Sequence, residues 1–226
     1  MKPKRVIITG AKGKIGKILL DSLNEYQITP LDLPEVDLRN YEYLLNIFAG
    51  HDAIIHLAWD TQSDNWRQEI FNPNNLLVAY NVYKAALEAK VPRILIASSV
   101  HVDKYRTWNE ARLLSVDQTP EPDSPYGASK IFVEALGRYY ATKGLEVICI
   151  RFGGVNVRNE PPVGDPKERV VWFSHRDCVD LVKKCLEAKH IENNFLIIYG
   201  VSNNQGRAHD YSSPLGWKPL EGAKDL

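Results

Sequence analysis

Short apolar runs alternate with stretches of helical spacing along most of the chain. Continuous apolar runs predict strands buried on both faces of a sheet, and they fall at residues 6–8, 28–31, 52–58, 94–99, 145–150 and 195–199. Helical patterns occupy residues 15–23, 41–48, 72–89, 125–143 and 177–188. This alternation predicts an α/β fold with a doubly wound parallel sheet, and ligands of such sheets bind at the carboxyl ends of the strands.

Three glycines follow the first predicted strand at three-residue spacing: Gly10, Gly13 and Gly16. Gly10 permits a sharp turn, Gly13 lets main chain approach a ligand, and Gly16 lets the next helix pack closely on the strand. The amino end of that helix would face a pyrophosphate. Asp32 ends the next apolar run, where a carboxylate accepts hydrogen bonds from the ribose of a dinucleotide. The combination predicts a Rossmann-like dinucleotide site, with a turn that binds no ligand as the alternative.

Asp32 also bears on the choice of cofactor. Its carboxylate suits the ribose hydroxyls of NAD and would repel the 2′-phosphate of NADP. Lys12 and Lys14 lie in the glycine turn and could attract that phosphate, but we expect Lys14 to point to solvent. Leu33 and Pro34 follow Asp32, so no arginine stands beside it to cover a phosphate. The sequence therefore predicts NAD as the cofactor.

Tyr126 and Lys130 are four residues apart on one predicted helix, so their side chains share a face. A phenol has a reference pKa of about 10, and a nearby ammonium group lowers it toward a value that suits a base at neutral pH. Ser99 ends the preceding strand and can hydrogen-bond the same substrate oxygen. Each feature alone has a simpler explanation: a pair on a helix surface, or serines 98 and 99 merely ending a strand. Together with the glycine turn, they fall at strand ends on one side of the sheet.

The motifs T-G-x-x-G-x-x-G, H-L-A, S-S and Y-x-x-x-K occur here in the order found in extended short-chain dehydrogenase/reductases, which the chain resembles over nearly its whole length. Segments 96–101, 126–130, 172–177 and 215–219 further resemble uronate dehydrogenases, which oxidise the C1 hydroxyl of a hexuronic acid to an aldarolactone with NAD. The resemblance implies an NAD-dependent dehydrogenase acting on a sugar acid. It implies Tyr126 as the base, Ser99 as its hydrogen-bonding partner and Lys130 on the nicotinamide ribose.

An NAD-dependent dehydrogenase of this kind needs further residues that bind the cofactor and the substrate. The predicted cofactor-binding residues are Gly10, Lys12, Gly13, Lys14, Ile15, Gly16, Asp32, Asp37, Leu38, Leu57, Ala58, Asn75, Tyr126 and Lys130. The predicted substrate-binding residues are Thr61, Ser99, His101 and Arg169. For Asp37 the alternative is a cap on the following helix, a role that Asn40 can also fill.

Two positions depart from the uronate dehydrogenase pattern. Val100 stands where those enzymes have asparagine, which would remove a polar group from the expected sugar site. Their carboxylate-binding arginine corresponds in spacing to Lys167, while Arg169 follows two residues later with the better bidentate geometry. Either cation could hold a carboxylate, or both could be solvated loop charges. His175 could equally be a structural histidine beside Asp177.

Composition narrows the class of partner. Lys and Arg together number 28, as do Asp and Glu, so the absence of net charge argues against nucleic acid or an anionic membrane as a partner. The three cysteines lie among apolar neighbours, which predicts buried thiols in a reducing compartment. No apolar run reaches the length of a membrane span, and no apolar leader precedes the first strand. We expect a cytoplasmic enzyme with no metal site.

We predict one domain over residues 1–226. A dinucleotide-binding core would comprise residues 1–150 and 177–199, and a small substrate-binding part residues 151–176 and 200–226. By analogy with the family, the helices at 72–89 and 125–143 would pair in a homo-oligomer. The alternatives are a nucleotide-sugar epimerase or dehydratase, and a non-catalytic dinucleotide-binding sensor.

Overall fold

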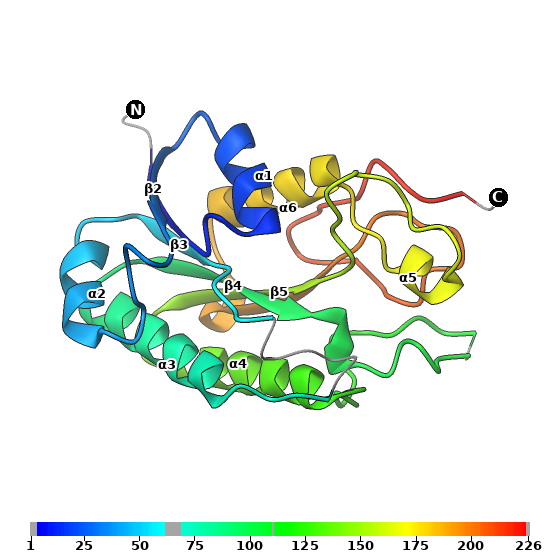
Figure 1. Ribbon diagram of the computed structural model, residues 1–226, viewed down its shortest axis with the longest axis horizontal. Helices are drawn as coiled ribbons and strands as arrows, with labels where there is room; N and C mark the ends of the chain where they lie inside the picture. Colours follow the sequence, from blue (N-terminus) through cyan, green and yellow to red (C-terminus); the bar gives the residue numbers. More distant parts are fainter. Residues whose placement is uncertain (1–3, 62–68, 110, 225–226) are drawn as a thin grey trace.

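Six parallel strands form a sheet at the centre of the molecule, in the order β2-β1-β3-β4-β5-β6 (Figure 1). The computed structural model describes residues 4–61, 69–109 and 111–224. The strands are β1 Arg5–Thr9, β2 Gln27–Leu31, β3 Ala53–His56, β4 Arg93–Ser99, β5 Glu146–Phe152 and β6 Phe195–Gly200. The parallel, doubly wound sheet predicted from the sequence is thus confirmed.

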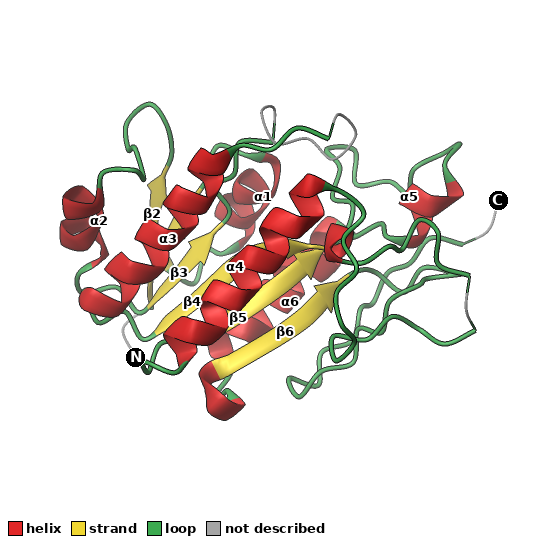
Figure 2. Cartoon of the chain, turned by 90° about the horizontal axis from the view of Figure 1, so that it is seen from below, coloured by secondary structure: helices red, strands yellow, loops and turns green. Residues whose placement is uncertain are grey.

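Helices cover both faces of this sheet. The α-helices are α1 Lys14–Ser22, α2 Tyr41–Phe48, α3 Pro73–Glu88, α4 Pro125–Ala141, α5 Pro166–Val170 and α6 His175–Glu187, and short 3₁₀ turns are η2 Val100–Val102 and η3 Glu192–Asn194. Helices α1 and α6 lie on one face, and α2, α3 and α4 lie on the other (Figures 1 and 2). Successive strand residues serve the two cores in turn: Val6 and Ile8 pack under α1, whereas Ile7 packs under α3.

Local signals in the sequence explain where several helices begin. The side chains of Asn40, Asn72, Ser124 and Ser174 accept a main-chain N–H at the start of α2, α3, α4 and α6 respectively. Of the two caps considered for α2, Asn40 is the one used. Helix α6 begins at His175, two residues before the predicted start, because Ser174 caps it. Helix α5 has only five residues, too few to show a helical pattern in the sequence.

The two segments assigned to the substrate-binding part lie together beyond the carboxyl ends of β5 and β6 (Figures 1 and 2). Hydrogen bonds join them directly: Gly153 N donates to Gly200 O at 2.9 Å, and Ser202 N donates to Trp172 O at 3.0 Å. The loop over 100–124 packs on the same region, where Leu114 N donates to Ala208 O at 2.7 Å. Their division from the core remains a prediction.

The three cysteines, Cys149, Cys178 and Cys185, are buried and unpaired, as predicted. Burial raises the pKa of the Cys178 thiol to about 12, so this sulfur stays protonated and packs as an apolar group. Within the described residues, no helix has both the length and the apolar character to cross a membrane.

Candidate active site

A cleft of about 570 Å³ opens at the carboxyl ends of β1, β2 and β3. Nine of the predicted cofactor-binding residues line it: Gly10, Lys12, Gly13, Asp32, Asp37, Leu38, Leu57, Ala58 and Asn75. Residues from the loops after β1, β2 and β3 and from the start of α3 therefore meet at the switch point between β1 and β3, where doubly wound sheets bind dinucleotides. Ile15 and Gly16 lie just behind the cleft in α1, Ile15 being partly buried against the core.

The glycine turn brings three stretches of main chain into close contact. Gly10 has a φ of 70°, and a Cβ there would lie 2.6 Å from the main-chain nitrogen of Ala58. A Cβ on Gly16 would lie 2.4 Å from the carbonyl oxygen of Gly10. Among the described residues, a Cβ on Gly13 would have only the Gly10 carbonyl oxygen within 4 Å, at 3.1 Å. The turn thus leaves the space in front of Gly13 open, and the residues present fit a pyrophosphate at the start of α1.

Asp32 is held at the mouth of the cleft by the turn itself. Its Oδ2 accepts from the main-chain nitrogen of Lys12 at 2.6 Å, and its Oδ1 from that of Leu33 at 2.8 Å. The Lys12 ammonium instead pairs with Glu35 Oε2 at 2.6 Å. One of the two cations that could favour NADP therefore already has an anionic partner.

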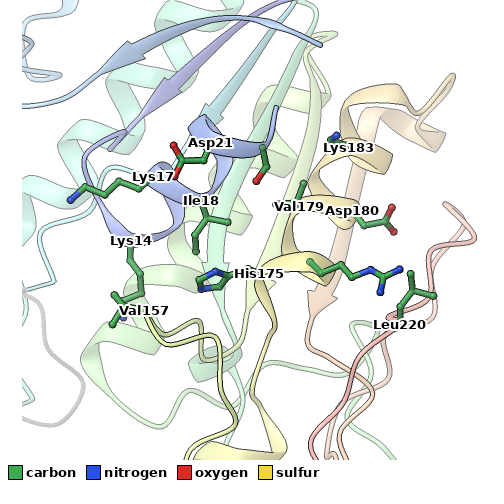
Figure 3. Close-up of a pocket in the computed structure, with 12 residues that line it drawn as sticks. Lys14, Lys17, Ile18, Asp21, Val157, His175, Val179, Asp180, Lys183 and Leu220 are labelled. Carbon is green, nitrogen blue, oxygen red and sulfur yellow. The ribbon is translucent and has the colours of Figure 1, made fainter. Parts of the chain in front are cut away.

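The second of those cations faces a different part of the molecule. Lys14 lines a groove of about 790 Å³ between α1 and α6, and its side chain extends toward Val157 (Figure 3). The groove also holds Lys17, Arg176 and Lys183. The Lys14 side chain therefore does not line the cleft. Lys14 is nevertheless the first residue of α1, whose amino end faces the cleft.

Arg39 is a cleft residue that the sequence reasoning missed. It lines the cleft near Asp32 because the segment after β2 turns back before α2 begins. Its guanidinium donates to Asp37, with Nε 2.9 Å from Oδ1, and this hydrogen bond lowers the pKa of Asp37 to about 2. Asp37 and Arg39 are two residues apart and lie before α2, so no helical spacing in the sequence indicated this ion pair.

The catalytic candidates meet where β4 ends and α4 begins. Lys130 is buried, 2% exposed, and its Nζ donates to the carbonyl oxygen of Ala97 at 3.1 Å. The same Nζ lies 5.5 Å from the centre of the Tyr126 ring. Ser99 is 5% exposed, and its Oγ accepts from the main-chain nitrogen of His101 at 3.2 Å. Ser98 points elsewhere, since its Oγ donates to Glu134 Oε1 at 2.6 Å.

Gly127 accounts for the close approach of these groups. A Cβ at this position would lie only 2.0 Å from the carbonyl oxygen of His101, so the first turn of α4 rests directly on η2. The contact carries Tyr126 to within 5.7 Å of the His101 ring, measured between ring centres. The sequence predicted no role for this glycine, which lies between Tyr126 and Lys130.

His101 is fixed in orientation by the end of the long loop. Its Nδ1 lies 2.7 Å from Asp123 Oδ2, and Ser124 Oγ donates to the other carboxylate oxygen at 2.8 Å. The imidazole is 8% exposed and contacts Tyr105 on its other side. The carboxylate accepts from a proton on Nδ1, and this contact fixes the orientation of the ring.

A buried charge network lies behind the catalytic residues. Arg151, fully buried in β5, donates to Glu134 Oε1 at 2.8 Å and to Asp103 Oδ2 at 3.2 Å. Tyr199 also donates to Asp103, and burial raises the pKa of this carboxyl group. Because Glu134 follows Lys130 by one turn of α4, the network ties the catalytic helix to β5 and β6.

The predicted carboxylate-binding cations contact main chain instead. Arg169 donates to the carbonyl oxygens of Pro162, at 3.3 Å, and Lys224. Lys167 donates to the carbonyl oxygen of Trp108 at 3.4 Å. Thr61 is exposed beside residues 62–68, which lie outside the described part of the chain.

Val100 and His175 both have structural surroundings. Val100 is 3% exposed and packs in a cluster with Tyr105 and Tyr199. His175 Nε2 lies 2.7 Å from the carbonyl oxygen of Asn156 and thus joins α6 to the loop after β5.

Residues 6–190 match the model of the NAD dependent epimerase/dehydratase family. The chain belongs to this family. Its relatives include L-arabinose 1-dehydrogenase (NAD(P)(+)) of Haloferax volcanii, which is 32% identical over 232 residues and covers 90% of each chain. Uronate dehydrogenase of Agrobacterium fabrum is 30% identical over 98% of this chain and 86% of its own length.

Solved structures agree with these relatives. The crystal structure of uronate dehydrogenase from Agrobacterium tumefaciens superposes with a TM-score of 0.83 at 29% identity, over 99% of this chain and 86% of that one. A variant of that enzyme complexed with NAD gives the same TM-score at 30% identity. The predictions of a Rossmann-like fold and of an NAD-dependent dehydrogenase of the extended short-chain type are confirmed.

Proposed function

We propose that this dehydrogenase oxidises the C1 hydroxyl of a cyclic sugar acid, a hexuronate, with Tyr126 as the base. The observation that carries the proposal is the meeting of Ser99, Tyr126 and Lys130 at the end of β4, next to the cleft formed by the glycine turn. A non-catalytic sensor would need the cleft but not these three side chains. The uronate dehydrogenases among the relatives and solved structures support a sugar acid as substrate.

NAD, when bound, would accept the hydride released from the sugar carbon. The glycine turn and Asp32 would hold its pyrophosphate and adenosine ribose, and Lys130 its second ribose. Ser99 would donate a hydrogen bond to the substrate oxygen while the Tyr126 phenolate takes the proton from it. The Lys130 ammonium favours that phenolate, since a positive charge nearby stabilises the negative form. His101, oriented by Asp123, would accept a hydrogen bond from a second sugar hydroxyl through Nε2.

A neutral aldose is the second candidate substrate, and one observation favours it. Both cations expected to hold a carboxylate, Arg169 and Lys167, donate to main-chain carbonyl oxygens. An aldose would need neither of them. The relative L-arabinose 1-dehydrogenase supports this alternative.

A substrate panel separates these candidates. NADH formation should be followed with D-galacturonate against D-galactose and with D-glucuronate against D-glucose, two pairs that differ only at the carboxylate, and with L-arabinose as a further neutral aldose. A kcat/KM for uronates well above that for the matched aldoses supports the first proposal, and the reverse supports the second. Ser99→Ala serves as a control that should retain NADH binding while losing turnover. Absence of turnover on every sugar would contradict both.

We further propose a cytoplasmic homo-oligomer in which α3 and α4 pack against a second copy. These helices lie side by side and expose large apolar side chains at Leu77, Tyr80, Phe132 and Tyr139, each between 41% and 55% exposed. Light scattering after gel filtration should give at least twice the chain mass. Leu77→Glu with Phe132→Glu should yield a monomer, whereas an unchanged mass would rule out this face.

A further inference from the structure

Trp59 contacts the catalytic lysine from the cofactor side. It follows β3 at the end of the sequence H-L-A-W and lines the cleft together with Ala58. The Lys130 Nζ lies 3.3 Å from the centre of a Trp59 ring, so the ammonium group rests on the indole face. This contact joins residues 71 positions apart and was not visible in the sequence.

Burial makes the contact important for Lys130. Lys130 as a whole is only 2% exposed, so its ammonium group has lost much of its hydration, and this loss must be compensated by other partners. The carbonyl oxygen of Ala97 accepts one hydrogen bond at 3.1 Å. The indole face adds an attraction to positive charge, and among aromatic side chains tryptophan provides the strongest.

The main chain beside Trp59 is anchored to a helix. The Asn75 side chain, 5% exposed in α3, accepts from Asp60 N at 2.9 Å and donates to Asp60 O at 3.2 Å. Asn72 Nδ2 donates to the Asp60 carboxylate at 3.1 Å. These bonds hold the main chain directly after Trp59 against the start of α3.

We propose that Trp59 is a positioning residue, whose indole face holds the Lys130 ammonium group in place for both the cofactor ribose and the Tyr126 base. The inference rests on the proposed function for the role of Lys130 in turnover, but its effect on cofactor binding stands apart from the sugar oxidised. Trp59 lies in the loop after β3, which Asn75 of α3 holds, and it contacts Lys130 on the catalytic helix α4. It therefore connects the cofactor cleft with that helix.

The test is a double-mutant cycle read by NADH binding, with kcat measured in parallel. Trp59→Leu keeps an apolar side chain but removes the aromatic face, and it should weaken NADH binding roughly 3- to 30-fold. Trp59→Phe keeps an aromatic face and should retain most of the NADH affinity of the wild type. In a Lys130→Met background, Trp59→Leu should have no further effect, because the group it supports is gone.

Two outcomes of this cycle overturn the inference. One is that Trp59→Leu lowers NADH affinity equally in both backgrounds, and the other is that Trp59→Phe lowers it as much as Trp59→Leu does. If Trp59→Leu does not fold, fluorinated tryptophans placed at position 59 give the same test, because fluorination weakens the attraction to cations while keeping the ring shape. NADH affinity that stays constant across the fluorinated series also overturns it. Coupling in NADH binding without oxidation of any sugar would contradict only the proposed function.

A matched control comes from a second lysine over a ring. Lys84 Nζ lies 4.3 Å from the centre of the Tyr41 ring, on the outer side of α2 and α3. Tyr41→Leu removes a contact of the same kind and should leave NADH binding unchanged. Loss of binding there would mean that such substitutions act through general destabilisation, and would remove the support for Trp59.

Discussion

The two halves of the sheet place their charges differently. On the cofactor side, formed by β2, β1 and β3, ion pairs lie in solvent: the side chains of Lys12 and Glu35 are 55% and 64% exposed. On the side of β4, β5 and β6, Arg151 is fully buried between Glu134 and Asp103. The first half shapes its cleft with close main-chain contacts at glycines, whereas the second combines one such contact, at Gly127, with buried charged side chains.

This difference predicts which substitutions each half tolerates. Exposed ion pairs contribute little to stability, whereas a buried charge that loses its partner is costly. The cofactor side should therefore change mainly in affinity when a side chain is removed, and the catalytic side in turnover or in stability. The five substitutions below test this contrast, from the largest expected effect to the smallest.

Tyr126→Phe should have the largest effect on the catalytic side. The ring keeps its place against His101 and loses only the proton acceptor, so turnover should fall about 10²- to 10⁴-fold while NADH still binds. Steady-state kinetics and NADH titration measure the two quantities separately. A near-normal kcat would show that another group is the base.

Arg151→Met should destabilise the fold by about 3–5 kcal/mol, because Glu134 and Asp103 are left buried without their cation. Urea unfolding at neutral pH measures the free energy of unfolding. Arg158→Met, at an exposed position, is the control and should change it by less than about 0.5 kcal/mol. Equal effects at the two positions would remove the contrast between buried and exposed charge.

His209→Phe should reduce the sensitivity of the fold to acid. Burial lowers the pKa of His209 from 6.5 to about 3, so below pH 6.5 the unfolded chain takes up a proton that the folded chain does not. This contribution to stability is complete above pH 6.5 and is lost as pH falls, by about 2 kcal/mol at pH 5. Urea unfolding at pH 7 and pH 5 should show a smaller drop for the variant. Identical drops would mean that His209 does not stay neutral.

Arg169→Ala tests whether the catalytic side recognises a carboxylate. If the substrate is a uronate, KM for it should rise about tenfold or more, since a charge-assisted bidentate contact accounts for about 1.5–3 kcal/mol. NAD affinity and KM for a matched aldose should stay the same. An unchanged KM for the uronate would mean that Lys167 binds the carboxylate or that the substrate is a neutral sugar.

Asp32→Ala should give the smallest change, on the cofactor side. The wild type should prefer NAD, because Asp32 faces the cleft and Lys12 is paired with Glu35. In the variant, the ratio of kcat/KM for NAD to kcat/KM for NADP should fall about three- to tenfold, mainly because kcat/KM for NAD decreases. Comparing kcat/KM for NAD and NADP in both proteins measures this. Equal use of both cofactors by the wild type would mean that Lys12 or Arg39 outweighs the carboxylate.

The sequence revealed those parts of the site that depend on neighbours along the chain. The glycine turn, Asp32 at the end of β2 and the Tyr126–Lys130 pair each sit within one element or at its end, where periodicity and spacing are informative. Since parallel strands all point to one edge, placing these residues at strand ends was enough to bring them together.

Other features depend on contacts between distant segments, which no periodicity shows. Trp59 meets Lys130 only because β3 and α4 lie on neighbouring parts of the same edge. Arg169 turns toward the carbonyl oxygen of Lys224 because an irregular segment passes beside α5. Val100 packs with Tyr105 and Leu114 of the long loop, a contact that its position after the fourth strand does not show.

The buried carboxylate of Asp177 has a consequence for how the protein is made. Its Oδ1 accepts from the main-chain nitrogen of Leu220 at 2.7 Å, and its Oδ2 accepts from Glu221 at 3.2 Å and from Ser202 Oγ at 2.6 Å. During translation, the cofactor half leaves the ribosome well before residues 220–221 do. The Asp177 carboxylate can therefore gain its full set of hydrogen bonds only after residues 220 and 221 have been synthesised, and α6 carries an incompletely paired acid until then.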